Sequence, residues 1–400
     1  LEAVAPLSVG AAPTHSAGGG FWVFLAKAGQ RQALAERLTE LSRAVGGRVV
    51  QHGLVDQGAR ITWQPSAAIA AFKANPGPLI LRGVTKGSDQ NYNWGGKKFI
   101  PDLLGIDNSA GKAYAELWIG APPNDPAGAS ATTIQGVDLT LQDLLDGAAD
   151  ELLGPEEAAA FRRRLPYLLK VLDAEKMLSI QAHPNKRQAE EGFARENAAG
   201  IPLTAGHRNY KDDNHKSEVH VALTDFWMLH GFRPLEEIAR ILDEVPEFSD
   251  LKPSFEQGGL RGLYEQVITM PQEQVDAVLN PLVERLTPAS QAGQLEKDAP
   301  DFWAARAAEH FPLPGGHRDR GIFSIYFLNL LHLQPGQGTY QPAGVLHAYL
   351  EGTNMELMAN SDNVLRGGLT PKHVDVPELL DKVVFEGGRP AVLTGEQVSG

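Results

Sequence analysis

The spacing of apolar positions predicts a β scaffold that one helical segment interrupts. From residue 78 onward, short apolar runs such as "PLILRGV", "YNWGG" and "AYAELWIG" are bounded by glycine and proline, which is typical of strands. The run "YLLKVLDAEKMLSIQAH" predicts a pair of buried strands, whereas residues 138–164 have apolar positions at helical spacing. Most of this region therefore indicates sheet, with a shorter helical stretch inside it.

Helical spacing dominates residues 226–315, where proline and glycine divide the pattern into several helices. The following run "GIFSIYFLNLLHLQPGQGTYQPAGVLHAYLEG" returns to short strands with turn residues between them. We therefore predict one β domain formed by residues 78–225 and 316–400, with residues 226–315 as a helical insertion.

The first 77 residues form a separate region in this pattern. Residues 1–20 are rich in small residues and lack a helix or strand period, so we predict a flexible arm. Residues 21–77 predict a small α/β unit, with strands at "FWVFLAK", "RVVQHGLV" and "ARITWQ" and helices at "QRQALAERLTELSRAV" and "SAAIAAFKA". This unit carries no recognisable chemistry, and its role stays open.

Composition narrows the classes of function. The formal net charge of -13 argues against a nucleic-acid partner, for which a basic face is expected. No apolar run reaches the ~20 residues that a membrane span needs, so we expect no membrane partner. The chain has no cysteine, which excludes disulfides, thiol nucleophiles and thiolate metal ligands. Any metal site must use nitrogen and oxygen donors, and the 12 histidines allow this.

Three polar segments are candidates for such a site: "LSIQAHPNK", "NHKSEVH" and the stretch from Gly344 to Lys372. Gln181 and His183 are two residues apart, so they share one face if the segment is a strand. Glu218 and His347 offer further oxygen and nitrogen donors that suit zinc. The spacing alone is equally consistent with ordinary polar residues whose hydrogen bonds are satisfied within a sheet. For a lone histidine, this structural role is commoner than metal binding.

These segments resemble type I mannose-6-phosphate isomerase, a zinc-dependent family with a cupin (jelly-roll) fold. The motifs "AYAELWIG", "LSIQAHPNK", "YKDDNHKSE" and "ELMANSDNVLRGGLTPK" match those of the family in the same order, over about residues 78–390. The resemblance implies a mainly β, cupin-type barrel. It also implies interconversion of mannose 6-phosphate and fructose 6-phosphate, a small phosphosugar substrate, and a cytoplasmic location.

The resemblance also implies roles for individual residues. One Zn²⁺ per chain is expected to bind to Gln181, His183, Glu218 and His347. The expected catalytic residues are Arg366, Glu356, His215 and Lys216, with Glu356 as the first candidate for the base. The residues expected to bind the substrate are Ser179, Lys170, Asp362 and Lys372.

The chain departs from the family pattern in three places. Residues 1–77 have no recognised counterpart, and the chain stops at Gly400 where family members continue with further β structure. The barrel is therefore either incomplete at its C-terminus or this is a fragment. His220 replaces a small or apolar residue two positions after Glu218; it could compete as a ligand, although a supporting or surface role is favoured.

Two rival functions remain open from the sequence. One is a non-catalytic, metal-bound cupin that binds sugar phosphates, since a fold alone does not fix an activity. The other is a different metal-dependent cupin enzyme, such as an oxygenase. The presence of Glu356 and Arg366 favours catalysis over simple binding, and glutamine as a ligand favours zinc without redox chemistry. The oligomeric state is not predictable from this pattern.

Overall fold

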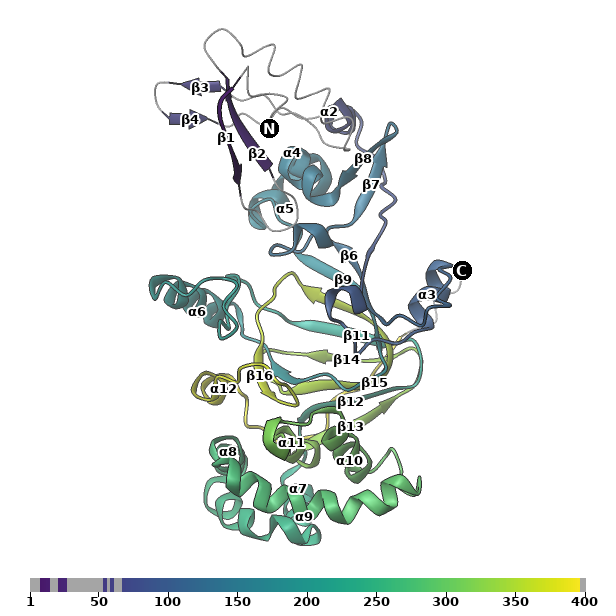
Figure 1. Cartoon of the computed structure of the whole chain (residues 1–400), viewed down its shortest axis with the longest axis vertical. Helices are drawn as coiled ribbons and strands as arrows, with labels where there is room; N and C mark the ends of the chain where they lie inside the picture. The colour runs from purple at the N-terminus through teal and green to yellow at the C-terminus, as the bar shows by residue number, and fades with distance from the viewer. Residues whose placement is uncertain (1–7, 15–20, 27–52, 56–57, 61–66, 396–400) are drawn as a thin grey trace.

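The computed structural model describes residues 8–14, 21–26, 53–55, 58–60 and 67–395. In this part of the chain, a large sheet lies between an N-terminal group of short strands and helices at one end and the helices of residues 235–327 at the other (Figure 1). No helix among these residues is long and apolar enough to cross a membrane.

The N-terminal region contains two small hairpins. Strand β1 (Ser8–Thr14) pairs with β2 (Phe21–Ala26), and β3 (Gly53–Val55) pairs with β4 (Gly58–Arg60). The prediction that residues 1–20 contain no strand is therefore wrong for β1, because backbone pairing with β2 forms a strand that small residues do not signal. The helix expected at "QRQALAERLTELSRAV" lies outside the described residues, and so do most of "RVVQHGLV" and most of "ARITWQ".

Helix α2 (Ala67–Ala74) confirms the prediction for "SAAIAAFKA". Its buried face, including Ile69 and Phe72, packs against Leu144 of α4 (Leu141–Leu153), which α5 (Pro155–Ala160) follows. The hairpin of β7 (Ala131–Ile134) and β8 (Val137–Thr140) lies beside them (Figure 1). The helices therefore confirm the helical pattern of residues 138–164, apart from strand β8 at its start.

The main sheet has two branches that share one strand, β15 (His347–Ala359). The first branch has the order β17 (Leu393–Thr394), β14 (Gln337–Gln341), β11 (Glu218–Ala222), β15, β9 (Tyr167–Ala174), β6 (Tyr114–Gly120) and β5 (Val84–Gly87). In the second branch, β16 (Leu365–Gly368) pairs with β10 (Ile180–Ala182), β10 pairs with β15, and β12 (Phe226–Phe232) pairs with both β15 and β13 (Leu328–Leu333).

Strand β15 passes from one branch to the other at Gly352. Residues before it pair with β12, and residues from Gly352 onward pair with β9. Gly352 has φ of +115°, a conformation that residues with a side chain rarely adopt. A strand that changes sheets at a bend is how two sheets are joined at a corner. The bend therefore places the two halves of β15 on two walls of one interior.

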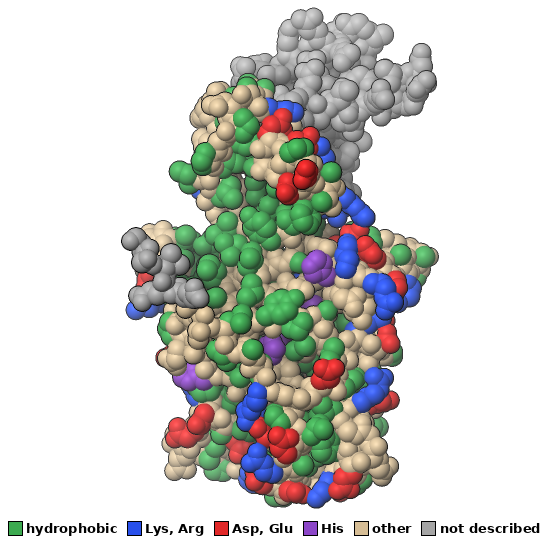
Figure 2. Space-filling model, turned by 180° about the vertical axis from the view of Figure 1, so that it is seen from behind, with side chains coloured by type: hydrophobic (Ala, Val, Ile, Leu, Met, Phe, Trp, Pro, Cys, Tyr) green, Lys and Arg blue, Asp and Glu red, His purple; other side chains and the backbone are tan. Residues whose placement is uncertain are grey.

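The first branch has its polar side chains on the inside. On β15, Glu356 is 3% exposed, whereas its neighbours Met355 and Leu357 are 40% and 43% exposed. This is the reverse of the alternation expected for a sheet that covers an apolar core. Hydrophobic side chains are correspondingly common across the middle of the molecule when it is seen from behind (Figure 2). The inner face of this branch is therefore the place to look for charged functional side chains.

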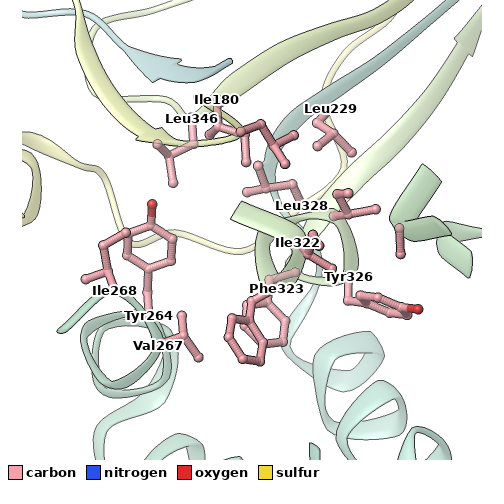
Figure 3. Close-up of a cluster of buried hydrophobic side chains, with 14 of the residues drawn as sticks. Ile180, Leu229, Tyr264, Val267, Ile268, Ile322, Phe323, Tyr326, Leu328 and Leu346 are labelled. Atoms are coloured by element: carbon pink, nitrogen blue, oxygen red, sulfur yellow. The ribbon is translucent and has the colours of Figure 1, made fainter. Parts of the chain in front are cut away.

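The helical insertion covers the second branch. It contains α7 (Leu235–Glu244), α8 (Lys252–Thr269), α9 (Gln272–Gln291) and α10 (Pro300–His310), and α11 (Gly321–Phe327) follows it. Tyr264 and Val267 of α8 and Phe323 of α11 belong to the same apolar cluster as Ile180 of β10 and Leu346, which directly precedes β15 (Figure 3). Fully burying one such side chain contributes about 1.5–3 kcal/mol, so this core anchors the second branch.

Two predictions in this region are wrong. Residues 226–232 form strand β12 and not the start of the helical insertion, and residues 321–327 form helix α11 and not a strand. Both segments are almost completely buried, so apolar residues occupy every face and neither a two-residue nor a 3.6-residue period is visible. From Leu235 to His310 the segment is mainly helical, as its periodicity predicts.

Two short helices flank the candidate site. Helix α6 (Lys186–Ala198) directly follows "LSIQAHPN", and the Asn185 side chain caps it by accepting a hydrogen bond from the Gln188 amide. Helix α12 (Val376–Lys382) follows β16 and is capped by Asp375. The asparagine of the motif therefore serves local structure. A further helix, α3 (Phe99–Leu104), precedes β6.

We expect Gly352→Ala to lower the free energy of unfolding by about 2–4 kcal/mol, because the residue adopts a left-handed conformation and has no room for a side chain. A Cβ atom at this position would lie 2.3 Å from the Asp225 carbonyl oxygen and 2.9 Å from the Phe226 Cα. Urea denaturation measures the effect. Gly206→Ala is the control, since a Cβ there meets no atom within 4 Å, and equal stability of both variants would contradict the prediction.

Candidate active site

Three of the four predicted metal ligands lie together in the interior. His183 follows β10, Glu218 begins β11 and His347 begins β15, and their ligand atoms all lie within 4.8 Å of one another. The Nε2 atoms of His183 and His347 are each 3.3 Å from one oxygen of the Glu218 carboxylate. All three side chains are at most 2% exposed. The donor set of two imidazoles and one carboxylate suits zinc.

Backbone carbonyl groups orient both imidazole rings. Nδ1 of His183 lies 2.9 Å from the Asn363 carbonyl oxygen, and Nδ1 of His347 lies 3.0 Å from that of Val345. Both Nε2 atoms are buried without a hydrogen-bond partner among the described residues. A proton on Nδ1 leaves the Nε2 lone pair free, which is how ligand histidines are usually held. The arrangement therefore fits a bound metal ion.

The electrostatics of His183 and Glu218 agree with this interpretation. Burial lowers the pKa of His183 to about 4, so its ring is neutral at neutral pH. Burial acts to raise the pKa of Glu218, but the Lys216 ammonium and the two histidines outweigh it and hold that pKa well below its usual value. The Lys216 Nζ lies 2.9 Å from Glu218 Oε1. Neutral imidazoles and an ionised carboxylate are the forms that bind a metal.

Gln181, the fourth predicted ligand, lies on β10 beside this cluster. It is opposite His347 on one neighbouring strand and opposite Arg366 on the other. Directly paired residues of neighbouring strands place their side chains on the same face. Gln181 also lines the cavity described next, as Glu218 does.

A cavity of about 410 Å³ opens beside the cluster. Most of the predicted site residues line it: Lys170, Ser179, Gln181, Lys216, Glu218, Glu356, Arg366 and Lys372. His310 and Phe311, at the end of α10, also line it, so the helical insertion forms part of the wall. A cavity of this size and polarity suits a small polar ligand.

Glu356 and Lys170 form the charged centre of the cavity wall. They are paired residues on β15 and β9, with Lys170 Nζ 3.8 Å from Glu356 Oε1. The Tyr349 hydroxyl donates a 2.7 Å hydrogen bond to Glu356 Oε2. Burial, with the nearby Glu218 charge, raises the pKa of Glu356 above its usual value. A buried carboxylate with a raised pKa is a good candidate for a general base.

Two further cations, Arg366 and Lys372, also line the cavity. The Arg366 guanidinium is half-buried, and no described residue forms a hydrogen bond or ion pair with it. Burial lowers the pKa of Lys372, as do the charges of Arg366 and Lys211 nearby. Ser179 lines the same cavity. Positive groups without a protein partner are available for an anionic ligand.

His215 and Asp362 do not line the cavity. Burial and the charge of Lys186 lower the pKa of His215. Asp362 accepts a 3.0 Å hydrogen bond from Asn124, and its amide donates to Asp212. His220 is 1% exposed, which excludes the surface role; its Nε2 contacts the Thr339 hydroxyl at 2.8 Å and it is not in the cluster of three ligands.

The sequence analysis missed several residues of the cavity wall, above all Glu116, Tyr349 and His310. Glu116 stands alone among apolar residues in "AYAELWIG", and such an isolated charge in a buried strand is a usable signal. Tyr349 lies two residues after His347, and so shares its face of β15. His310 ends a helix of the insertion, and no local pattern indicates it.

Comparison with known proteins decides the family. The chain is 40% identical over 311 residues to the mannose-6-phosphate isomerase of Escherichia coli (strain K12). The matched region covers 76% of this chain and 75% of that protein. The chain belongs to the mannose-6-phosphate isomerase family. A family model described as phosphomannose isomerase type I, catalytic domain, matches residues 85–235. The family extends to animals, since the human protein is 38% identical over 319 residues, which cover 74% of this chain and 71% of that protein.

Solved structures of the family share the fold. A mannose 6-phosphate isomerase from Salmonella typhimurium, described as bound to its substrate (F6P) and zinc, has a TM-score of 0.67 and 39% identity. The match covers 78% of this chain and 75% of that one. A mannose 6-phosphate isomerase bound with zinc and yttrium gives the same values. The mainly β, cupin-type fold expected from the sequence is thereby confirmed.

Proposed function

We propose that the protein is a zinc-dependent aldose–ketose isomerase that interconverts mannose 6-phosphate and fructose 6-phosphate. The observation that carries the proposal is that three kinds of group meet at one cavity. They are a cluster of possible metal ligands, the buried carboxylate of Glu356, and the cations Arg366 and Lys372, which are unpaired among the described residues. The family relationship supports the same reaction, since its members are named for it. Fructose 6-phosphate is the substrate bound to the Salmonella relative.

Zinc would be held by His183, Glu218 and His347, with Gln181 as the fourth ligand. The unpartnered Nε2 atoms of the two histidines support this assignment. When bound, the ion would polarise or orient oxygens of the sugar. The set carries one negative charge against the two of the ion, so the site keeps a positive charge that suits an anionic intermediate.

Glu356 is our candidate for the base. A base must take the proton from the second carbon of the aldose phosphate and return it to the first carbon, through an enediolate. Glu356 lines the cavity, and the Tyr349 hydroxyl holds one of its oxygens, which fixes its orientation. The other two candidates are weaker: Lys216 is paired with Glu218, and His215 does not line the cavity.

Arg366, Lys372 and Ser179 are our candidates for binding the anionic parts of the substrate. A guanidinium can donate two parallel hydrogen bonds to a phosphate or to enediolate oxygens. Lys170 supplies a further positive charge in the cavity wall, next to Glu356. Asp362 as a substrate-binding residue, a cytoplasmic location, and the absence of nucleic-acid and membrane partners remain predictions.

The rival proposal of a non-catalytic binding protein has less support. Binding of a phosphosugar requires cations and hydrogen-bond donors, but it does not require a buried carboxylate beside the ligand. The negative charge of Glu356 would make binding of an anion less favourable. Its presence in the cavity wall is therefore better explained by catalysis than by binding alone. An assay of turnover separates the two functions directly.

We expect removal of the metal to abolish isomerisation and zinc to restore it. A coupled assay with mannose 6-phosphate measures this on protein as purified, after chelator and dialysis, and after adding zinc. Metal analysis should find one zinc ion per chain, lost in parallel with activity. Magnesium should not replace zinc, because it prefers oxygen ligands and octahedral geometry. Full activity in protein shown to be metal-free would contradict the zinc assignment.

A further inference from the structure

Glu116 is a buried carboxylate in the cavity wall. The mechanism proposed above does not use it. It lies on β6, is 6% exposed, and lines the same cavity as Glu356 and Arg366. A carboxylate is expensive to bury unless a positive charge compensates it. Its cation is Lys170, whose Nζ lies 3.4 Å from Glu116 Oε2.

Lys170 lies between two carboxylates. Its Nζ is 3.4 Å from Glu116 and 3.8 Å from Glu356, so one ammonium contacts both carboxylates. Burial acts to lower the pKa of Lys170, but the charges of Glu116 and Glu356 outweigh it and raise that pKa. Without Glu116, a buried ammonium would be balanced by Glu356 alone among the carboxylates within 4 Å that the structure describes.

Trp118 fixes the position of Glu116. Its indole Nε1 donates a hydrogen bond to Glu116 Oε2, the same oxygen that Lys170 approaches. The face of this indole also contacts cations: Lys170 Nζ lies 5.1 Å and Lys86 Nζ 4.6 Å from the ring centroid. Trp118 and Lys170 are directly paired on β6 and β9. The ammonium is therefore held by the carboxylate and by an aromatic face.

We propose that Glu116 is a positioning residue for catalysis: it holds the Lys170 ammonium against the cavity beside Glu356, where the ammonium stabilises negative charge on the reacting sugar. This rests on the proposed function above. The placement matters because a fixed positive charge stabilises an enediolate far better than one that must move into position. Glu116 itself does not touch the reacting atoms; it acts through Lys170.

A double-mutant cycle tests this inference. Glu116→Gln keeps an acceptor for the Trp118 N–H but removes the charge that holds Lys170. We expect its kcat to fall by about 10- to 100-fold, with KM changed less than kcat, and with zinc content and melting temperature retained. Lys170→Met should lose more. The double variant should be no slower than Lys170→Met, because Glu116 has no task once Lys170 is gone.

Glu351→Gln is the matched control, since Glu351 is also paired with cations, Lys297 and Arg306, but does not line the cavity. Its kcat should stay normal. If Lys170→Met does not fold, Lys170→Gln replaces it in the cycle. If the losses of the two single variants multiply in the double variant, this inference is wrong. Normal turnover of Glu116→Gln would also overturn it. Either result, obtained with an active wild type, would leave the proposed function intact. An inactive wild type would overturn the proposed function as well.

Discussion

The Glu356→Gln variant is expected to lose about 100- to 10,000-fold in turnover, the usual contribution of a general base. Glutamine has nearly the same shape and still accepts the hydrogen bond from Tyr349, so the fold and the metal site should survive. The measurements are kcat in the coupled assay, zinc content and melting temperature. Near-normal turnover would move the role of base to Lys216 or His215.

The pH dependence gives a second test of the same residue. A base works only when it is deprotonated, and the pKa of Glu356 is raised by burial and by Glu218. The wild-type kcat/KM should therefore fall with decreasing pH, starting above the range in which an exposed carboxyl group titrates. This acidic decline should disappear in Glu356→Gln. An unchanged decline in the variant would assign it to another group.

The Arg366→Ala variant should lose about 100- to 1,000-fold in kcat/KM, because it removes a guanidinium that lines the cavity without a partner among the described residues. The alternative is that Arg366 only supports the local structure of β16, and its loss would then lower stability more than activity. No described residue pairs with the guanidinium, which favours the first outcome. Melting temperature and zinc content should stay at wild-type values.

Lys211→Ala is a suitable control for this variant. Lys211 lies close enough to influence Lys372, yet it does not line the cavity. It should change kcat/KM only slightly. Equal losses in both variants would indicate a general effect of positive charge near the cavity. An unfolded Arg366→Ala variant, or one with normal turnover, would contradict the assignment of Arg366 to the anionic substrate.

The residues proposed for the site were easier to find in the sequence than the fold around them. The motif "LSIQAHPNK" and the segments around Glu218 and His347 contain the three residues that the structure brings together, and the resemblance to the family pointed to them. Periodicity alone would not have joined them, since Glu218 and His347 are 129 positions apart in the sequence. Their proximity depends on the pairing of β11 and β10 with β15, which has no local signal.

Segments that are buried on all sides account for the errors in secondary structure. Residues 226–232 and 321–327 are both apolar runs, yet one is a strand and the other a helix. Amphipathic segments give a clear period because one face meets water, and these segments have no such face. Tertiary packing decides whether such a segment becomes a strand or a helix, and this packing cannot be predicted from a short stretch of sequence.

Strand β15 carries His347, Tyr349 and Glu356 on one continuous backbone, on both sides of the bend at Gly352. The spacing between a proposed metal ligand and the proposed base is therefore set by nine residues of a single strand. Insertions or deletions elsewhere, for example in helices α7–α10, can change the rim of the cavity and its entrance without altering that spacing. Such a chain can acquire new selectivity for the sugar while its proton-transfer geometry stays constant.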